Sequence, residues 1–196
     1  MDEAIICSHR LQPLHLGHLH FWMEVRQKYQ EHLIICILRR SEELENVRIG
    51  LGNPDTFEAF SRLAFAIERN PLPNWERLRL TSLAVASEPT LIQNTTILLR
   101  NRPDVSWEAS IEDLPKARKW AFNVISEPSF SRAKVEYYRA RGEEVIEMNF
   151  GRYGGYDGQD IRGLLRKGNR DFSFLPPACQ QYFADNCLRY FLIGSE

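Results

Sequence analysis

Paired cysteines are missing from this sequence. The chain of 196 residues has four cysteines, and none belongs to a Cys-x-x-Cys pair or to a metal-ligand spacing. Cys7 and Cys36 lie in apolar runs. Cys179 and Cys187 fall on one expected helix about 12 Å apart along its axis, whereas a disulfide needs Cα atoms within roughly 7 Å. We therefore expect four reduced and buried thiols.

Long apolar runs are missing as well. No stretch approaches the ~18 consecutive apolar residues that predict a membrane helix. The N-terminus has neither the basic start nor the apolar stretch of a signal peptide. We therefore expect a cytoplasmic protein with no membrane partner.

Charge of one sign is not in excess. The 25 Lys and Arg residues stand against 26 Asp and Glu residues, which gives a net charge of −1 and a pI near 6.5. Nucleic-acid-binding domains carry a basic footprint, so we expect no nucleic-acid partner. The sequence has no internal repeat, low-complexity tract or linker, and its length is typical of one domain of about 100–200 residues. We expect a single domain over 1–196, with C-terminal helices from about residue 175 packed on it.

Apolar runs and helical stripes alternate along the chain. Strands are expected over 4–7, 33–38, 79–85, 120–125 and 145–148. Helices are expected over 19–29, 56–69, 131–141 and 160–167, with a last one opened by Pro176-Pro177. The segment 87–118 is harder to assign, and we interpret it as an insertion or a substrate-facing region, in which 95–99 could be a strand and 107–113 a short helix. The alternation predicts an α/β fold, a Rossmann-like doubly wound parallel sheet with helices on both faces.

The loop after the first expected strand carries an unusual set of side chains. In such a sheet, ligands bind beyond the carboxyl ends of the strands. Residues 8–18 read Ser-His-Arg-Leu-Gln-Pro-Leu-His-Leu-Gly-His. Gly17 lets a ligand approach the backbone, and the helix N-terminus offers unpaired N–H groups to a phosphate. His15 and His18 share a face once helical and could donate hydrogen bonds to a phosphoryl group. The alternative, in which one packs under the loop and the other is exposed, suits isolated histidines better, and we apply it to His9 and His20.

A second loop, rich in glycine, precedes the helix at 160–167. Residues 154–162 read Gly-Gly-Tyr-Asp-Gly-Gln-Asp-Ile-Arg. Glycines before a helix start favour a second anion site, and Arg162, one turn into the helix, can direct its guanidinium at the same phosphate oxygens. Alone, such a turn is common and Arg162 could be a surface charge. This loop therefore supports the prediction of a phosphate site only when it is considered together with the first loop.

Both loops resemble known signatures. Residues 10–18 resemble the Arg-Phe-Gln-Pro-Phe-His-x-Gly-His signature of the HIGH-motif nucleotidyltransferases, most closely the archaeal-type nicotinamide-mononucleotide adenylyltransferases. Residues 156–162 are similar to their second signature, Tyr-Ser-Gly-Thr-Glu-Ile-Arg. Weaker similarities occur at 53–56 and 103–107. The resemblance covers about residues 4–170.

The resemblance implies that AMP moves from ATP to the phosphate of nicotinamide mononucleotide, which yields NAD and pyrophosphate. His15 and His18 would contact the transferring phosphoryl group, and Arg162 would neutralise the β- and γ-phosphates. Contacts to the ATP phosphates are also expected from Arg10, Gly17, Asp157 and Gly158.

The acceptor and the metal ion follow from the same resemblance. Trp107 would stack on the nicotinamide ring, although a short helix can also carry a core tryptophan. Mg²⁺ would bridge the ATP phosphates, held mostly by substrate oxygens and water, so no metal ligand is expected from the protein. Relatives of this kind often form homo-oligomers.

Three departures from the family pattern bear on the expected chemistry. His9 stands where the family has Gly, and Asp157 and Gln159 stand where it has Ser and Thr. A carboxylate at position 157 would repel phosphate unless it faces away or meets a metal ion. Two alternatives therefore stay open. One is adenylyl or cytidylyl transfer to another acceptor, namely nicotinate mononucleotide, phosphopantetheine or a flavin phosphate. The other is a nucleotide-binding sensor without turnover.

Overall fold

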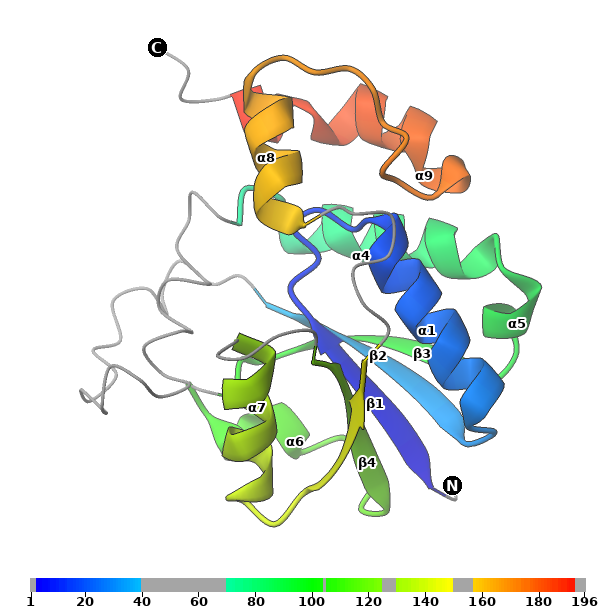
Figure 1. Ribbon diagram of the computed structural model, residues 1–196, viewed down its shortest axis with the longest axis vertical. Helices are drawn as coiled ribbons and strands as arrows, with labels where there is room; N and C mark the ends of the chain where they lie inside the picture. The colour runs from blue at the N-terminus through cyan, green and yellow to red at the C-terminus, as the bar shows by residue number, and fades with distance from the viewer. Residues whose placement is uncertain (1–2, 40–69, 104, 125–129, 150–156, 193–196) are drawn as a thin grey trace.

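The computed structural model describes residues 3–39, 70–103, 105–124, 130–149 and 157–192 of the chain (Figure 1). The described strands are β1 (Ala4–His9), β2 (His32–Leu38), β3 (Thr95–Arg100), β4 (Arg118–Asn123) and β5 (Glu144–Met148). The described helices of the first part are α1 (Leu16–Lys28), α4 (Asn74–Ala86), α5 (Pro89–Ile92) and α6 (Trp107–Ile111). They are followed by α7 (Phe130–Arg139), α8 (Gly158–Arg166), α9 (Pro177–Tyr182), the π-helical segment η3 (Phe183–Cys187) and α10 (Arg189–Leu192).

The five strands form one parallel sheet in the order β3-β2-β1-β4-β5. β1 and β2 are runs of Ile, Leu and Cys buried on both faces, as is typical of central parallel strands. From β1 the chain moves outward through β2 to β3, and then crosses to the other side of β1 for β4 and β5. The order reverses between β1 and β4, so a crevice is expected beyond the carboxyl ends of these strands.

Alternate residues of the central strands pack against helices on opposite faces of the sheet. Ile5, Cys7 and Ile35 belong to a core cluster that contains residues of α1, α4, α5 and the C-terminal helices. Ile6 and Ile34 belong to a second cluster with residues of β4, α6 and α7. The predicted doubly wound α/β fold is thus confirmed.

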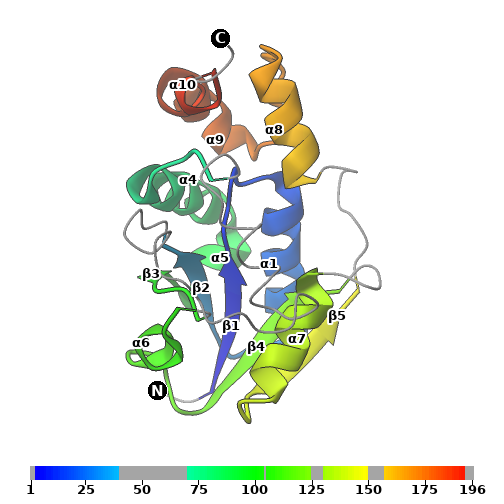
Figure 2. The same cartoon turned by 90° about the vertical axis from the view of Figure 1, so that its left-hand side faces the viewer.

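The C-terminal helices share the first core cluster. Cys179, Phe183 and Phe191 are buried in it. Figures 1 and 2 show α8, α9 and α10 beyond the carboxyl end of β1. The four cysteines are free and buried, as the sequence predicts.

The structure contradicts two of the expectations for the middle of the chain and confirms two others. The strand predicted over 79–85 is wrong, because these residues lie in α4, which begins directly after Pro73. The interpretation of 87–118 as an insertion is also wrong, because this segment supplies β3, which pairs with β2. The strand over 95–99 and the short helix from Trp107 are confirmed. The helix predicted over 56–69 lies outside the described residues.

Among the described residues, the helices are too short or too polar to cross a membrane.

Candidate active site

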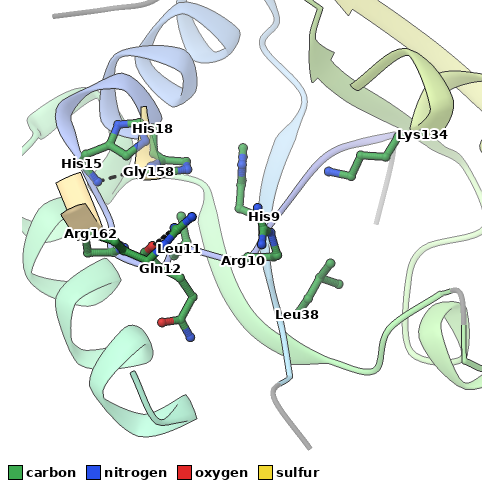
Figure 3. A pocket seen from close by; sticks show the side chains of 11 residues that line it. His9, Arg10, Leu11, Gln12, His15, His18, Leu38, Lys134, Gly158 and Arg162 are labelled. Atoms are coloured by element: carbon green, nitrogen blue, oxygen red, sulfur yellow. Dashed lines mark hydrogen bonds between the residues drawn. The ribbon is translucent and has the colours of Figure 1, made fainter. Parts of the chain in front are cut away.

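A polar pocket of about 180 Å³ lies at the carboxyl ends of β1 and β2 (Figure 3). Pockets that enclose a drug-sized ligand have volumes of about 300–1,000 Å³, so the lining described suits the phosphate end of a nucleotide better than the whole molecule. Six of the lining residues are histidine, arginine or lysine, namely His9, Arg10, His15, His18, Lys134 and Arg162. Among the described lining residues no side chain is acidic.

The loop between β1 and α1 is held by hydrogen bonds from other elements. Arg77 of α4 donates from Nη1 to the carbonyl oxygens of Arg10 and Leu38, each at 2.7 Å. The Gln12 side chain donates to the carbonyl of Leu72 at 2.8 Å and accepts from its N–H at 2.9 Å. These bonds are buried or partly buried, so they fix the backbone that carries the pocket side chains.

His15 and His18 form a reciprocal cap at the start of α1. His15 is the N-cap residue, and its Nδ1 accepts a hydrogen bond from the N–H of Gly17 at 3.1 Å. Nδ1 of His18 accepts from the N–H of His15 at 3.3 Å. A ring nitrogen that accepts carries no proton, so the proton of each neutral imidazole is on Nε2. The two ring centroids are 3.9 Å apart, and the pair can present two adjacent N–H donors.

Burial keeps both rings uncharged at neutral pH. It lowers the pKa of His15 to about 4, where Asp157 opposes the shift and Arg162 adds to it. Burial also lowers the pKa of His18 well below its usual value, helped by His15 and other neighbouring positive groups. Each histidine therefore offers a hydrogen bond without adding charge.

Arg162 brings a charge to this pair from α8. The side chain is buried and donates from Nη1 to the carbonyl of Gln12 at 2.6 Å. Gly158, at the start of α8, also lines the pocket. A Cβ atom at position 158 would lie 3.2 Å from Nη1 of Arg162, so glycine allows the guanidinium to sit against the helix start. The structure thus brings together the predicted residues Arg10, His15, His18, Gly158 and Arg162.

The N-terminal N–H groups of α1 and α8 differ from the expectation. At α1, Leu16 donates to the carbonyl of Phe174 and Gly17 donates to His15, so these N–H groups are occupied within the protein. At α8, Asp157 is the N-cap, and its carboxylate accepts from the N–H groups of Gln159 and Asp160. The predicted phosphate contacts from Gly17 and Asp157 are therefore not part of the described pocket lining, and side chains supply its donors.

Trp107 lies away from the pocket. Its ring is partly buried in the second core cluster, with centroids 5.3 Å from Tyr138 and 6.0 Å from Tyr137. The structure therefore does not bring the expected ring-stacking residue together with the histidine pair.

Two titratable lining residues, His9 and Lys134, are not among the site residues expected from the sequence. His9 was assigned a structural or surface role, yet it lines the pocket, and its Nε2 is buried without a hydrogen-bond partner among the described residues. Lys134 of α7 also lines the pocket. The helix that carries it was predicted, and it follows the strand beside β1, so its place in the topology could have indicated Lys134.

The pocket can bind and polarise an anion with several oxygen atoms. Neutral N–H donors stand beside two guanidinium groups and the amine of Lys134, and the lining is held by buried hydrogen bonds. Such preorganised donors stabilise charge that develops during transfer of a phosphoryl group. Among the described residues, no cluster of three or more His, Cys, Asp or Glu side chains could hold a metal ion.

Comparison with known proteins finds similarity in structure. The sequence matches neither a protein-family model nor a curated protein. The fold is similar to that of a bifunctional NMN adenylyltransferase/ADP ribose pyrophosphatase from Francisella tularensis, crystallised with AMP and a Mn ion, with a TM-score of 0.59 and 14% identity. That match covers 97% of this chain and 51% of the other, so the chain spans about half the length of the bifunctional protein.

A second similar structure has nearly the size of this chain. It is a Vibrio parahaemolyticus protein assigned as a nicotinate-nucleotide adenylyltransferase, with a TM-score of 0.55 and 14% identity. The match covers 94% of this chain and 99% of that one. At these identities the two comparisons establish a shared fold, a Rossmann-like parallel sheet.

Proposed function

We propose that this chain is an adenylyltransferase that moves AMP from ATP to the phosphate of nicotinamide mononucleotide. The observation that carries the proposal is the pair of neutral imidazoles, His15 and His18, set beside the buried Arg162 at the switch point of the sheet. The resemblance of residues 10–18 and 156–162 to nucleotidyltransferase signatures and the shared fold of two adenylyltransferases support it.

The proposed reaction exchanges one phosphoanhydride bond for another. An oxygen of the acceptor phosphate attacks the α-phosphorus of ATP, the bond to the β-phosphate oxygen breaks, and pyrophosphate leaves with the bonding electron pair. The acceptor phosphate is already ionised near neutral pH, so the reaction needs no general base. Catalysis then depends on positioning and on stabilisation of charge.

Four of the pocket side chains have proposed roles in this reaction. The Nε2–H groups of His15 and His18 donate to the oxygens of the transferring phosphoryl group. Arg162 neutralises the β- and γ-phosphates, and Arg10 anchors a nucleotide phosphate. Magnesium enters as part of the substrate, held by the phosphate oxygens of ATP and by water, because such ions are usually bound through substrate phosphates.

The identity of the acceptor is the second part of the proposal. The two structural relatives are linked by their names to nicotinamide and nicotinate nucleotides respectively. We therefore place nicotinamide mononucleotide first and nicotinate mononucleotide second. Phosphopantetheine and flavin mononucleotide are the remaining acceptors to compare.

Pyrophosphate release tests the proposal. The full chain is incubated with MgATP and each acceptor in turn, and NAD formation is followed by chromatography. We expect pyrophosphate release and stoichiometric NAD with nicotinamide mononucleotide. Turnover with another acceptor would correct the substrate and keep the reaction class. ATP binding without turnover of any acceptor would overturn the enzyme assignment in favour of a nucleotide sensor.

A further inference from the structure

Lys134 enters the pocket from the side opposite to the histidine pair and α8. Figure 3 shows it extending from α7 toward the centre of the pocket, while His15, His18 and Arg162 lie together on the other side. Its Nζ donates to the carbonyl of Ser8 on β1 at 3.1 Å and lies 4.9 Å from the ring centroid of Phe122 on β4. These contacts hold the amine beside the point where β1 and β4 diverge.

The geometry of phosphoryl transfer indicates which of the two substrates Lys134 would contact. The attacking and leaving oxygens lie roughly in line on opposite sides of the phosphorus. If the histidine pair and Arg162 hold the triphosphate of ATP, the attacking phosphate arrives from the opposite side of the pocket. We propose that Lys134 binds the phosphate of the acceptor on that side, an inference that rests on the adenylyl transfer proposed above.

The charges around Lys134 favour an anion. Burial, with the help of the Arg10 charge and against the effect of Cys7, lowers the pKa of Lys134 to about 7. His9 and His18 also face Lys134, since its charge contributes to the lowered pKa of both rings. Burial and the charge of Arg10 both disfavour the protonated amine, and a bound phosphate dianion would oppose their effect. Lys134 is then mostly neutral at pH 8 in the free protein and takes up a proton when the phosphate binds.

His9 adds a second observation at the same place. Its Nε2 is buried in the pocket lining without a hydrogen-bond partner among the described residues. Buried polar atoms in proteins nearly always have a partner, so an orphaned one in a pocket indicates that a ligand or water completes it. The centroid of its ring lies 5.2 Å from that of His18, and Figure 3 shows His9 between the histidine pair and Lys134.

The test compares two variants of α7. Lys134→Met removes the amine and keeps an apolar stem on Phe122. Arg139→Met is the matched control, because Arg139 pairs with Glu147 at 2.7 Å and does not line the pocket. With ATP and the acceptor varied separately, Lys134→Met should raise the KM for the acceptor about 10-fold or more, as for a lost charge-assisted hydrogen bond. The KM for ATP should change little, and Arg139→Met should behave like the wild type.

Proton uptake separates a phosphate contact from a purely structural role. Binding of the turned-over acceptor is measured by calorimetry at pH 8 in two buffers with different ionisation enthalpies. The wild type and Arg139→Met should take up nearly one proton per acceptor, whereas Lys134→Met should take up almost none. Circular dichroism checks the fold, and Lys134→Gln is a second variant if Lys134→Met does not fold.

The outcomes distinguish a failure of the role proposed for Lys134 from a failure of the adenylyl transfer on which that role rests. An unchanged acceptor KM with unchanged proton uptake in Lys134→Met would overturn the role of Lys134 while the wild-type turnover stands. If Lys134→Met raised the KM for ATP instead, Lys134 would contact ATP and not the acceptor, and the proposal would be overturned. Absence of wild-type turnover with every acceptor would remove the adenylyl transfer, and this inference with it.

Discussion

Some residues of the pocket supply neutral hydrogen-bond donors, and others supply positive charge. His15 and His18 supply directed N–H donors without charge, since each Nδ1 accepts from the backbone and burial lowers the pKa of each ring. Arg162 and Arg10 supply charge. Neutral donors are compatible with close packing, because the two ring centroids could not approach to 3.9 Å as cheaply if both rings were charged.

Removal of one donor should affect the chemical step. We expect His18→Ala to lower kcat by about 10²–10³-fold, as for the loss of one preorganised donor to developing charge. His18→Gln, whose amide can place an N–H near the Nε2 position, should recover part of the rate. Steady-state kinetics of both variants is the measurement, with His20→Ala on the same helix as the control outside the pocket lining. A kcat close to wild type in His18→Ala would remove His18 from the mechanism.

Sequence spacing could predict the histidine pair but not every partner. His15 and His18 lie three residues apart at one helix start, where the reciprocal N-cap brings their rings together. Asp157 was expected at the phosphates, and the structure shows it as the N-cap of α8, a role that Asp and Ser share. Lys134 could not be identified from charge alone, because most lysines are exposed and its burial depends on the packing of α7 against β1 and β4.

At the scale of elements, α8 positions Arg162 through the glycine at its first residue. Gly158 and Gly163 lie on the same helix, but only at position 158 would an added Cβ meet a pocket atom, Nη1 of Arg162 at 3.2 Å. At position 163 an added Cβ meets nothing within 4 Å. The two glycines therefore form a matched pair for mutation.

Gly158→Ala and Gly163→Ala should have opposite consequences. We expect Gly158→Ala to displace the guanidinium and lower kcat/KM about 10-fold, because small misplacements of a positioning group are costly. Gly163→Ala should leave kcat/KM unchanged and raise the free energy of unfolding by about 0.5–1 kcal/mol, since alanine is favoured over glycine inside a helix. Enzyme kinetics and urea unfolding measure the two effects. Equal activity in both variants would contradict the close approach at position 158.

The error at α4 shows where helical periodicity fails as a signal. The buried residues of this helix follow a helical stripe, namely Glu76, Arg77, Leu80, Thr81, Ala84 and Val85. The first two are charged, so no apolar face is visible in the first turn. Arg77 is buried because it holds the carbonyl groups of Arg10 and Leu38, and such tertiary hydrogen bonds leave no trace in a hydropathy pattern. The C-terminal part of the helix, taken alone, then has the pattern of a strand.

At the scale of the whole molecule, the parallel sheet could be predicted because its central strands are continuous apolar runs. The sheet order places residues from the start, the middle and the end of the chain around one pocket, from His9 through Lys134 to Arg162. This convergence of positive and neutral nitrogen groups has a thermodynamic consequence. The folded protein resists protonation at three partly buried histidines, His9, His15 and His18, that the unfolded chain protonates readily.

The free energy of unfolding should therefore fall as the pH is lowered from about 6.5 to about 5. The folded pKa is about 4 for His15 and well below 6.5 for His9 and His18, whereas each is near 6.5 in the unfolded chain. The unfolded state binds more protons in this window, so each histidine lowers stability by up to about 1.4 kcal/mol per pH unit. Lys134, whose folded pKa is about 7, is protonated in both states there and adds little to the slope.

Urea unfolding of the wild type and of His18→Gln measures this contribution. Between pH 6.5 and 5 the free energy of unfolding of the variant should fall less steeply than that of the wild type. The difference in slope should correspond to close to one proton fewer taken up on unfolding. Between pH 7.5 and 8.5 the histidines are neutral in both states, so the two proteins should lose or gain stability in parallel, which serves as the control. Identical slopes in the acidic window would mean that His18 titrates normally in the folded protein. Its Nε2 proton would then belong to a charged imidazolium as often as to a neutral donor near pH 6.5, and the pocket would bind phosphate through charge rather than through neutral donors.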